Sequence, residues 1–256
     1  MKSEDNDRVV WVTGAGKGIG RSLAMRFAKE GREVAVTSRT ERDLISLKSE
    51  ARDMLGKIYP YPGDVTDINK IKILFNKIQA DIGVIDLAIL NAGTYIRFGI
   101  DKFSPELFRE QMEINTMGTV NCLSPVMHDM KTRREGHIVI VSSLCAYRGL
   151  PYASAYGASK AALTNMCESL KPELDKFDVK LSVVHPGFVR TPLTDRNDFE
   201  MPFLVDAEFA SKRIIEGIRC EKFEICFPSK LALIMKLLRC LPYYLYFAVT
   251  KRILKK

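Results

Sequence analysis

Short apolar runs alternate along the chain with longer amphipathic stretches. Seven runs rich in β-branched residues are typical of buried strands, and they lie at 9–13, 33–38, 57–61, 85–90, 137–141, 180–185 and 223–227. The stretches between them predict helices at 21–29, 41–55, 67–80, 105–130, about 156–176 and 206–219. Strands separated by helices cannot pair as hairpins. The pattern therefore predicts an α/β fold, with a doubly wound, mostly parallel seven-stranded sheet and helices on both faces.

Single residues indicate where several of these helices begin and end. Gly31 stops the first helix, and Ser104 followed by Pro105 is a typical helix start. Pro172 lacks a backbone N–H, so we expect it to kink its helix or to end the regular part of it. No repeat or linker interrupts residues 1–228, which we expect to form one domain.

Residues 229–256 form a C-terminal extension that differs from this domain in charge and pattern. Its first apolar positions have the spacing of one helix face: Leu231, Ile234, Met235 and Leu238. An aromatic apolar stretch follows Pro242, and seven basic residues but no acidic residue occur from residue 225 onward. A basic amphipathic extension suits peripheral contact with an anionic membrane. Packing on the body, closing a substrate site or contacting another subunit are equally open interpretations.

Composition and charge narrow the class of protein. With 256 residues, of which 46% are hydrophobic and 27% charged, the chain can bury a large core. Seven of the eight net positive charges lie in the extension, so we expect no nucleic-acid surface across the fold. Six scattered cysteines and three histidines predict neither a metal site nor a disulfide framework, which favours a cytoplasmic location. The charged N-terminus predicts no signal peptide.

A glycine-rich turn lies between the first expected strand and the first expected helix. Its sequence is Thr13-Gly14-Ala15-Gly16-Lys17-Gly18-Ile19-Gly20. Glycines let a pyrophosphate approach the backbone, and the free N–H groups of a helix N-terminus favour an anion. Three further groups follow later strands: Asp64, Asn91-Ala92-Gly93 and Ser142-Ser143. In a parallel sheet these strand ends share one edge, so the pattern predicts a dinucleotide site there.

Tyr156 and Lys160 are four residues apart, so on a helix they share one face. An ammonium beside a phenol favours the phenolate and lowers the pKa of the phenol. Such a pair is suited to proton transfer near neutral pH. Taken alone, however, so short a motif is more often a helix start with a solvated lysine.

Together these motifs resemble the short-chain dehydrogenase/reductase family in order and spacing, over residues 8–227. The resemblance implies an NADP-dependent enzyme that transfers a hydride between NADP(H) and a carbonyl or alcohol substrate. It implies that Tyr156 is the general acid and base and that Lys160 lowers its pKa and binds the nicotinamide ribose. It also implies a homodimer or homotetramer.

Two further catalytic roles follow from the resemblance. Ser143, thirteen residues before Tyr156, would hydrogen-bond and polarise the carbonyl, with Ser142 as the competing assignment. Alternation along a strand sends these two side chains to opposite sides. Asn115 would hold a helix distortion and a water that links Lys160 to solvent.

The resemblance also implies a set of cofactor contacts: Gly14, Gly16, Lys17, Gly18, Ile19, Gly20, Ser38, Arg39, Asp64, Val65, Asn91, Ala92, Gly93, Tyr156, Lys160, Pro186, Gly187, Val189 and Thr191. Members that prefer NAD normally carry an acid at the end of the second strand. This chain has Ser38 and Arg39 there, and Arg39 and Lys17 would face the 2′-phosphate of NADP. The alternative is that both cations are simply solvated.

Residues 186–205 should cover the substrate, because loops at this edge carry specificity. The expected substrate contacts are Ser143, Cys145, Tyr152, Phe188 and Leu193. The apolar side chains of the loop indicate an apolar, lipid-like substrate, or else they pack against the body. An alternative function is a non-catalytic regulatory or membrane-recruited protein that retains the cofactor fold.

Overall fold

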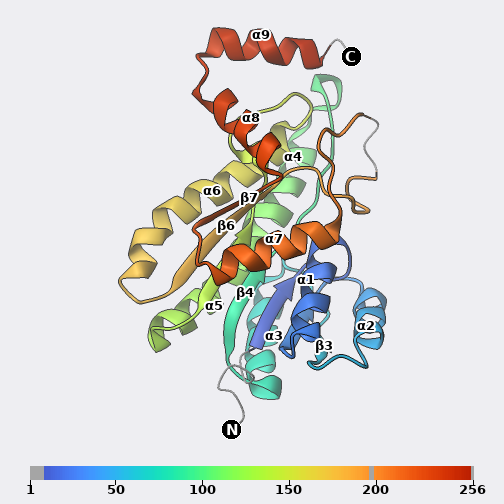
Figure 1. The fold of residues 1–256 in the computed structure, drawn as a ribbon, viewed down its shortest axis with the longest axis vertical. Helices are drawn as coiled ribbons and strands as arrows, with labels where there is room; N and C mark the ends of the chain where they lie inside the picture. The colour runs from blue at the N-terminus through green and yellow to red at the C-terminus, as the bar shows by residue number, and fades with distance from the viewer. Residues whose placement is uncertain (1–8, 196–198, 255–256) are drawn as a thin grey trace.

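Seven parallel strands form the centre of the computed structural model, which describes residues 9–195 and 199–254 (Figure 1). Their spatial order is β3-β2-β1-β4-β5-β6-β7. The strands are β1 (Val9–Thr13), β2 (Glu33–Thr37), β3 (Ile58–Pro60), β4 (Ile85–Leu90), β5 (His137–Val141), β6 (Lys180–Pro186) and β7 (Glu224–Phe227). The order reverses between β1 and β4, and a ligand crevice is expected at such a point. The predicted doubly wound fold is confirmed.

Helices cover both faces of the sheet (Figure 1). They are α1 (Gly18–Lys29), α2 (Glu41–Glu50), α3 (Ile68–Ile82), α4 (Pro105–Met112), α5 (Gly118–Arg133), α6 (Ser154–Asp175), α7 (Ala207–Arg219), α8 (Ser229–Cys240) and α9 (Tyr243–Ile253). Short helical turns are η1 (Ile100–Lys102), η2 (Glu113–Met117) and η3 (Leu144–Ala146). Within β1, Val10 and Val12 pack on the α1 and α7 side, and Val9 and Trp11 on the opposite side. Because both faces are covered, the strand is apolar throughout.

The expected helix over 105–130 is divided into two. η2 is a π-helical turn between α4 and α5, and it contains Asn115. Pro172 lies in the last turn of α6, which ends at Asp175. α2 ends at Glu50 instead of residue 55.

α7 returns the chain to the first helix of the fold. The Ser211 and Ser22 hydroxyls lie 2.8 Å apart, and Arg26 of α1 pairs with Glu208 at 3.1 Å. These contacts fix the N-terminal half of α7 to α1.

α8 packs one face on the body. Leu231, Ala232 and Met235 are buried in a third apolar cluster, and Lys236 pairs with Glu224 on β7. Ile234 was expected on this face but is 43% exposed, because Ala232 takes the inner position beside Leu231. No helix in the described ranges is long and apolar enough to cross a bilayer. The domain boundary expected at residue 228 stays a prediction.

Candidate active site

The glycine-rich turn fits tightly against the end of β4. Gly14 and Gly18 have φ angles of 66° and 57°, in the left-handed region that favours glycine. A Cβ on Gly20 would lie 2.5 Å from the Gly14 carbonyl oxygen, and one on Gly14 would lie 2.8 Å from the Ala92 Cα. Side chains at these positions would push the turn away from the sheet. α1 begins directly at Gly18, so its free N–H groups lie at the turn.

Thr13 and Asn91 hold the ends of β1 and β4 together. The Thr13 hydroxyl oxygen accepts from the Asn91 and Ala92 backbone N–H groups at 3.0 and 3.1 Å. The Asn91 side-chain amide donates to the Thr13 carbonyl at 3.0 Å. These bonds place Gly93, the next residue, at the edge of the crevice.

Gly93 lets two polar side chains approach the chain closely. A Cβ at this position would lie 3.1 Å from the Asn115 amide oxygen and 3.3 Å from the Lys160 ammonium nitrogen. The Asn115 amide oxygen accepts from the Thr94 N–H at 2.7 Å, and its amide nitrogen donates to the Thr94 carbonyl and the Ser159 hydroxyl. The side chain of Asn115 thus links η2, which contains it, to the segment after β4 and to α6. The water relay expected through it stays a prediction.

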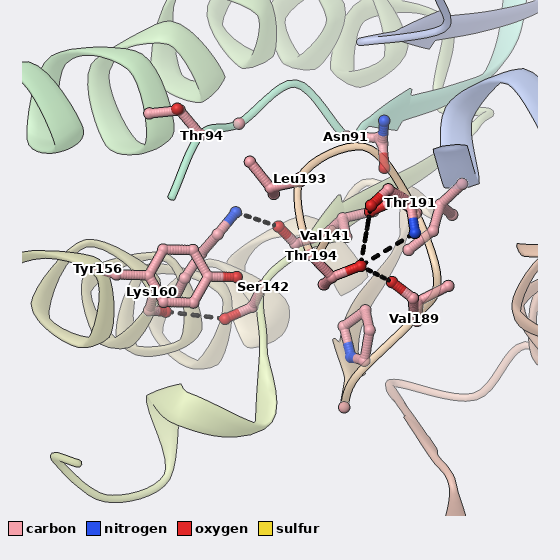
Figure 2. A pocket seen from close by; sticks show the side chains of 14 residues that line it. Asn91, Thr94, Val141, Ser142, Tyr156, Lys160, Val189, Thr191, Leu193 and Thr194 are labelled. Atoms are coloured by element: carbon pink, nitrogen blue, oxygen red, sulfur yellow. Dashed lines mark hydrogen bonds between the residues drawn. The ribbon is translucent and has the colours of Figure 1, made fainter. Parts of the chain in front are cut away.

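Lys160 is buried at the floor of the site. Its ammonium donates to the Val141 carbonyl oxygen at 2.9 Å, as Figure 2 shows. Burial lowers the pKa of Lys160 to about 8, because an ammonium is poorly solvated there. At neutral pH the amine is still largely protonated.

Tyr156 lies one helical turn before Lys160 on α6. Burial raises the pKa of its phenol above the ordinary value of 10.0, and a hydrogen bond with Ser143 opposes this rise. That Lys160 lowers this pKa stays a prediction, since burial sets the direction of the net shift. The ammonium lies 5.9 Å from the phenol ring centroid and donates to Val141, so desolvation outweighs its attraction.

The two neighbouring serines have different partners. The Ser142 hydroxyl donates to the Lys160 carbonyl at 2.9 Å and lies 3.0 Å from the Thr164 hydroxyl, so it secures α6 to β5. The Ser143 hydroxyl accepts from the Cys145 N–H at 3.2 Å, and its interaction with the Tyr156 phenol lowers the pKa of that phenol. The geometry therefore favours Ser143 over Ser142 as the second donor beside the phenol.

A cleft of about 120 Å³ connects these groups, and Figure 2 shows the side chains around it. Its lining is Ile19, Asn91, Gly93, Thr94, Val141, Ser142, Tyr156, Lys160, Pro186, Gly187, Val189, Thr191, Leu193 and Thr194. Thr191 closes it toward the glycine-rich turn, because a Cβ on Gly18 would lie 2.8 Å from the Thr191 methyl carbon. Ten of the residues predicted from the sequence are therefore brought together here.

Thr94 and Thr194 were not predicted. Thr94 directly follows the Asn91-Ala92-Gly93 motif, and this position next to the motif could have indicated that it lines the site. The Thr194 hydroxyl donates to the Val189 carbonyl at 2.7 Å and accepts from the Thr191 N–H at 3.0 Å. It fixes the shape of the loop, which depends on tertiary contacts that no local pattern indicates.

Four expected substrate contacts lie outside this lining: Ser143, whose neighbour Ser142 lines the cleft instead, and Phe188, Tyr152 and Cys145. Phe188 does not line the cleft, and its ring packs on Phe199 with the ring centroids 5.8 Å apart. Tyr152 has a φ of 63° and packs under the Arg97 guanidinium at 4.4 Å. Cys145 lies near the Tyr156 phenol, whose pKa it helps to raise.

The expected 2′-phosphate region contains a carboxylate that was not anticipated. Lys17 lies 3.5 Å from the Asp43 carboxylate of α2, which also approaches Gly16. Arg39 is exposed beyond the end of β2, and the Ser38 hydroxyl donates to the Thr40 carbonyl. Asp43 offsets part of the positive charge expected here.

The remaining predicted cofactor residues, Asp64 and Val65, lie beyond the lining of the cleft. The Asp64 carboxylate accepts from the Thr66 N–H and hydroxyl, which fixes the turn after β3. Val65 is buried against Gly118 of α5, where a Cβ would lie 2.6 Å from it. Contact of these two residues with an adenine ring stays a prediction. The described residues contain no cluster suited to a metal ion.

Comparison with known proteins places these features in context. Residues 8–201 match the family model described as short chain dehydrogenase. An uncharacterized oxidoreductase of Myxococcus xanthus is 34% identical over 251 residues, which cover 98% of this chain and 99% of that protein. Two solved structures share the fold. A short chain dehydrogenase/reductase of Burkholderia phymatum in complex with NAD has a TM-score of 0.82 at 22% identity, covering 90% and 92% of the two chains. A short-chain dehydrogenase of Sphingobium yanoikuyae in complex with NADPH has a TM-score of 0.81 at 23% identity, with the same coverage.

Proposed function

The chain belongs to the short chain dehydrogenase family, and from this premise we propose that it reduces an apolar carbonyl substrate with NADPH, or oxidises the corresponding alcohol. One observation carries the proposal. Tyr156, Ser143 and Lys160 converge beside a cleft that runs to the glycine-rich turn. A proton donor, a second hydrogen-bond donor and a cation thus meet where a dinucleotide would end.

The residues present fit a nicotinamide dinucleotide. Side chains on Gly14 and Gly20 would displace the turn, and α1 directs its free N–H groups there, so backbone and dipole both suit a pyrophosphate. Gly187, Val189 and Thr191 line the opposite wall and would hold the carboxamide. When bound, such a cofactor supplies or accepts a hydride.

The raised pKa of Tyr156 supports the role that we propose for it in reduction. At neutral pH the phenol keeps its proton, so it can donate that proton to the carbonyl oxygen as the carbonyl carbon receives the hydride. Ser143 hydrogen-bonds the same oxygen and stabilises the charge that develops on it. Lys160 holds a positive charge beneath them and would bond the ribose.

An apolar substrate is supported by the chemistry of the cleft. Ile19, Val189 and Leu193 contribute apolar groups to its lining, and Ser142 and Lys160 lie on the same side of it as Tyr156 (Figure 2). Such a site would orient a carbonyl by its oxygen and accept a hydrocarbon portion alongside it. The preference for NADP rests on Arg39 and Lys17, although Lys17 shares its charge with Asp43.

Steady-state turnover of aldehydes and ketones of increasing chain length, measured as loss of NADPH absorbance, tests the proposal. Tyr156→Phe should lower kcat by roughly 100- to 10,000-fold and leave the NADPH dissociation constant nearly unchanged. Tyr244→Phe, an exposed position on α9, is the matched control. If the wild-type protein binds NADPH but reduces no carbonyl, the non-catalytic regulatory alternative replaces the enzyme.

Cofactor choice has a separate test. The ratio of kcat/KM with NADPH to that with NADH should exceed one, and Arg39→Ala should lower it roughly tenfold. A wild-type preference for NADH would show that Asp43, and not Arg39, controls this end of the site. The expected oligomer and cytoplasmic location stay predictions.

A further inference from the structure

α9 exposes apolar side chains around most of its circumference. Only two of its described side chains, those of Tyr246 and Thr250, are buried toward the body. The large apolar residues that remain at least 40% exposed on this helix are Tyr243, Tyr244, Leu245, Phe247 and Val249. Exposed apolar patches of this kind on a folded protein mark a contact surface.

The helix is held in a defined orientation. The Arg148 guanidinium lies 4.5 Å from the ring centroids of both Tyr243 and Tyr246. Arg148 also donates to the Leu241 carbonyl at 3.3 Å, and the Tyr246 hydroxyl donates to the Gly149 carbonyl. The apolar face is therefore presented by a fixed helix.

α8 adds further exposed apolar residues to the same end of the molecule. Its inner face is buried, but Leu233, Ile234 and Leu237 are between 43% and 61% exposed. Figure 1 shows α8 and α9 at one end of the long axis, with α3 and β3 near the other. We call the exposed residues of 229–254 the C-terminal surface.

The charge of the C-terminal surface indicates which kind of partner it can bind. Lys230, Arg239, Lys251 and Arg252 are exposed on it, and the sequence contains no acidic residue after Glu224. A second copy docked face to face would bring these like charges together, which opposes association. Anionic headgroups would neutralise them, and aromatic rings with cationic neighbours are typical of helices that lie in a membrane interface.

We propose that the C-terminal surface binds the headgroup region of an anionic bilayer, with α9 lying in the plane of the membrane. The exposed rings and aliphatic side chains enter the boundary between headgroups and acyl chains, and the four cations contact lipid phosphates. The binding is peripheral, since neither helix spans a bilayer. Membrane binding of this kind needs no catalysis, so it does not depend on the proposed reaction.

Co-sedimentation of the full-length protein with vesicles tests it. Phosphatidylcholine vesicles with and without phosphatidylglycerol are compared at physiological ionic strength, and binding should require the anionic lipid. The double variant Lys251→Gln with Arg252→Gln should lower the partition coefficient roughly 10- to 30-fold. Lys48→Gln with Lys70→Gln, at exposed positions of the body, is the matched control and should bind as the wild type does.

A second pair of variants tests the apolar contribution. Tyr244→Asp with Leu245→Asp should lower binding by roughly tenfold or more, whereas Leu55→Asp with Ile73→Asp, exposed on the body, should leave most of it intact. Circular dichroism checks that each variant is folded. Truncation at residue 228 is a poor test, because Leu231 and Met235 fill a core cluster.

Two outcomes would overturn the proposal. One is equal partitioning of all variants, or equal binding to neutral and anionic vesicles. The other is a wild-type protein that stays in the supernatant while Tyr244→Asp with Leu245→Asp lowers its oligomeric mass in sedimentation velocity. That result would assign the surface to a contact between copies.

Discussion

Replacing Lys160 with methionine should make the protein more stable while removing its proposed activity. Lys160 is 4% exposed, and its ammonium has the Val141 carbonyl as its hydrogen-bond acceptor. Methionine has a similar length and volume but carries no charge. The substitution therefore removes the cost of burying an ammonium and retains most of the packing.

The magnitude follows from the pKa of Lys160. Burial lowers it from 10.5 to about 8, a difference of about 2.5, which corresponds to roughly 3 kcal/mol against the charged form. Losing the hydrogen bond to Val141 costs roughly 1 kcal/mol. Lys160→Met should then be more stable by roughly 2 kcal/mol at pH 7.

The sign of the pH dependence is fixed by the same values. Between pH 8 and 10.5 the unfolded chain holds a proton on Lys160 that the folded chain has released, so wild-type stability rises with pH in this window. The variant lacks this rise. Its advantage should shrink above pH 8 and disappear by about pH 10.

Urea unfolding of both proteins at pH 7, 8, 9 and 10 measures this difference, and NADPH-dependent reduction is assayed in parallel. Lys48→Met, at an exposed position of α2, should change the free energy of unfolding by less than roughly 0.5 kcal/mol at every pH. A Lys160→Met protein that is less stable than the wild type by the same amount at all four pH values would refute the reasoning. In that case the ammonium would not be penalised by its surroundings.

Three further predictions concern the turn, the serines and acid stability. Gly20→Ala should lower the free energy of unfolding by roughly 1–3 kcal/mol and weaken NADPH binding in a fluorescence titration, because its Cβ meets the Gly14 carbonyl at 2.5 Å; unchanged binding would contradict the fit. Ser143→Ala should lower kcat roughly 10- to 100-fold with little loss of stability, whereas Ser142→Ala should lower the free energy of unfolding by roughly 1–2 kcal/mol. Steady-state kinetics and urea unfolding measure the two effects, and the reverse pattern would exchange the roles of the two serines. Burial lowers the pKa of His137 and His185 from 6.5 to about 4, so the unfolded chain binds more protons between these values and stability should fall as the pH drops through them. In urea unfolding, His137→Gln should lose less stability over that window than the wild type does, and an equal loss would contradict this.

The fold and the centre of the site were predictable because local patterns determine them. β-branched runs such as Val9–Thr13 indicate strands covered on both faces, and the glycine-rich turn restricts its own backbone. The pairing of Tyr156 with Lys160 follows from helical spacing alone. These features need no knowledge of distant contacts.

Sequence patterns were insufficient where contacts between distant parts of the chain determine the environment of a side chain. Burial raises the pKa of Tyr156, and a four-residue motif does not indicate how deeply its tyrosine is buried. Asp43 reaches Lys17 from another helix. On α8, the choice of Ala232 over Ile234 as the inner residue depends on the angle at which the helix meets the body, which the apolar spacing does not determine.

The contact between Gly18 and Thr191 has a consequence for folding during synthesis on the ribosome. These residues, whose close approach leaves no room for a Cβ on Gly18, are 173 positions apart in the chain (191 − 18). A ribosome that adds roughly 5–20 residues per second needs roughly 9–35 s to make the second after the first. α7, which covers the Val10 and Val12 side of the sheet, emerges later still. Until then the nascent chain has an open crevice and an apolar sheet face that α1 covers without α7, and chaperones and proteases can bind it in this interval.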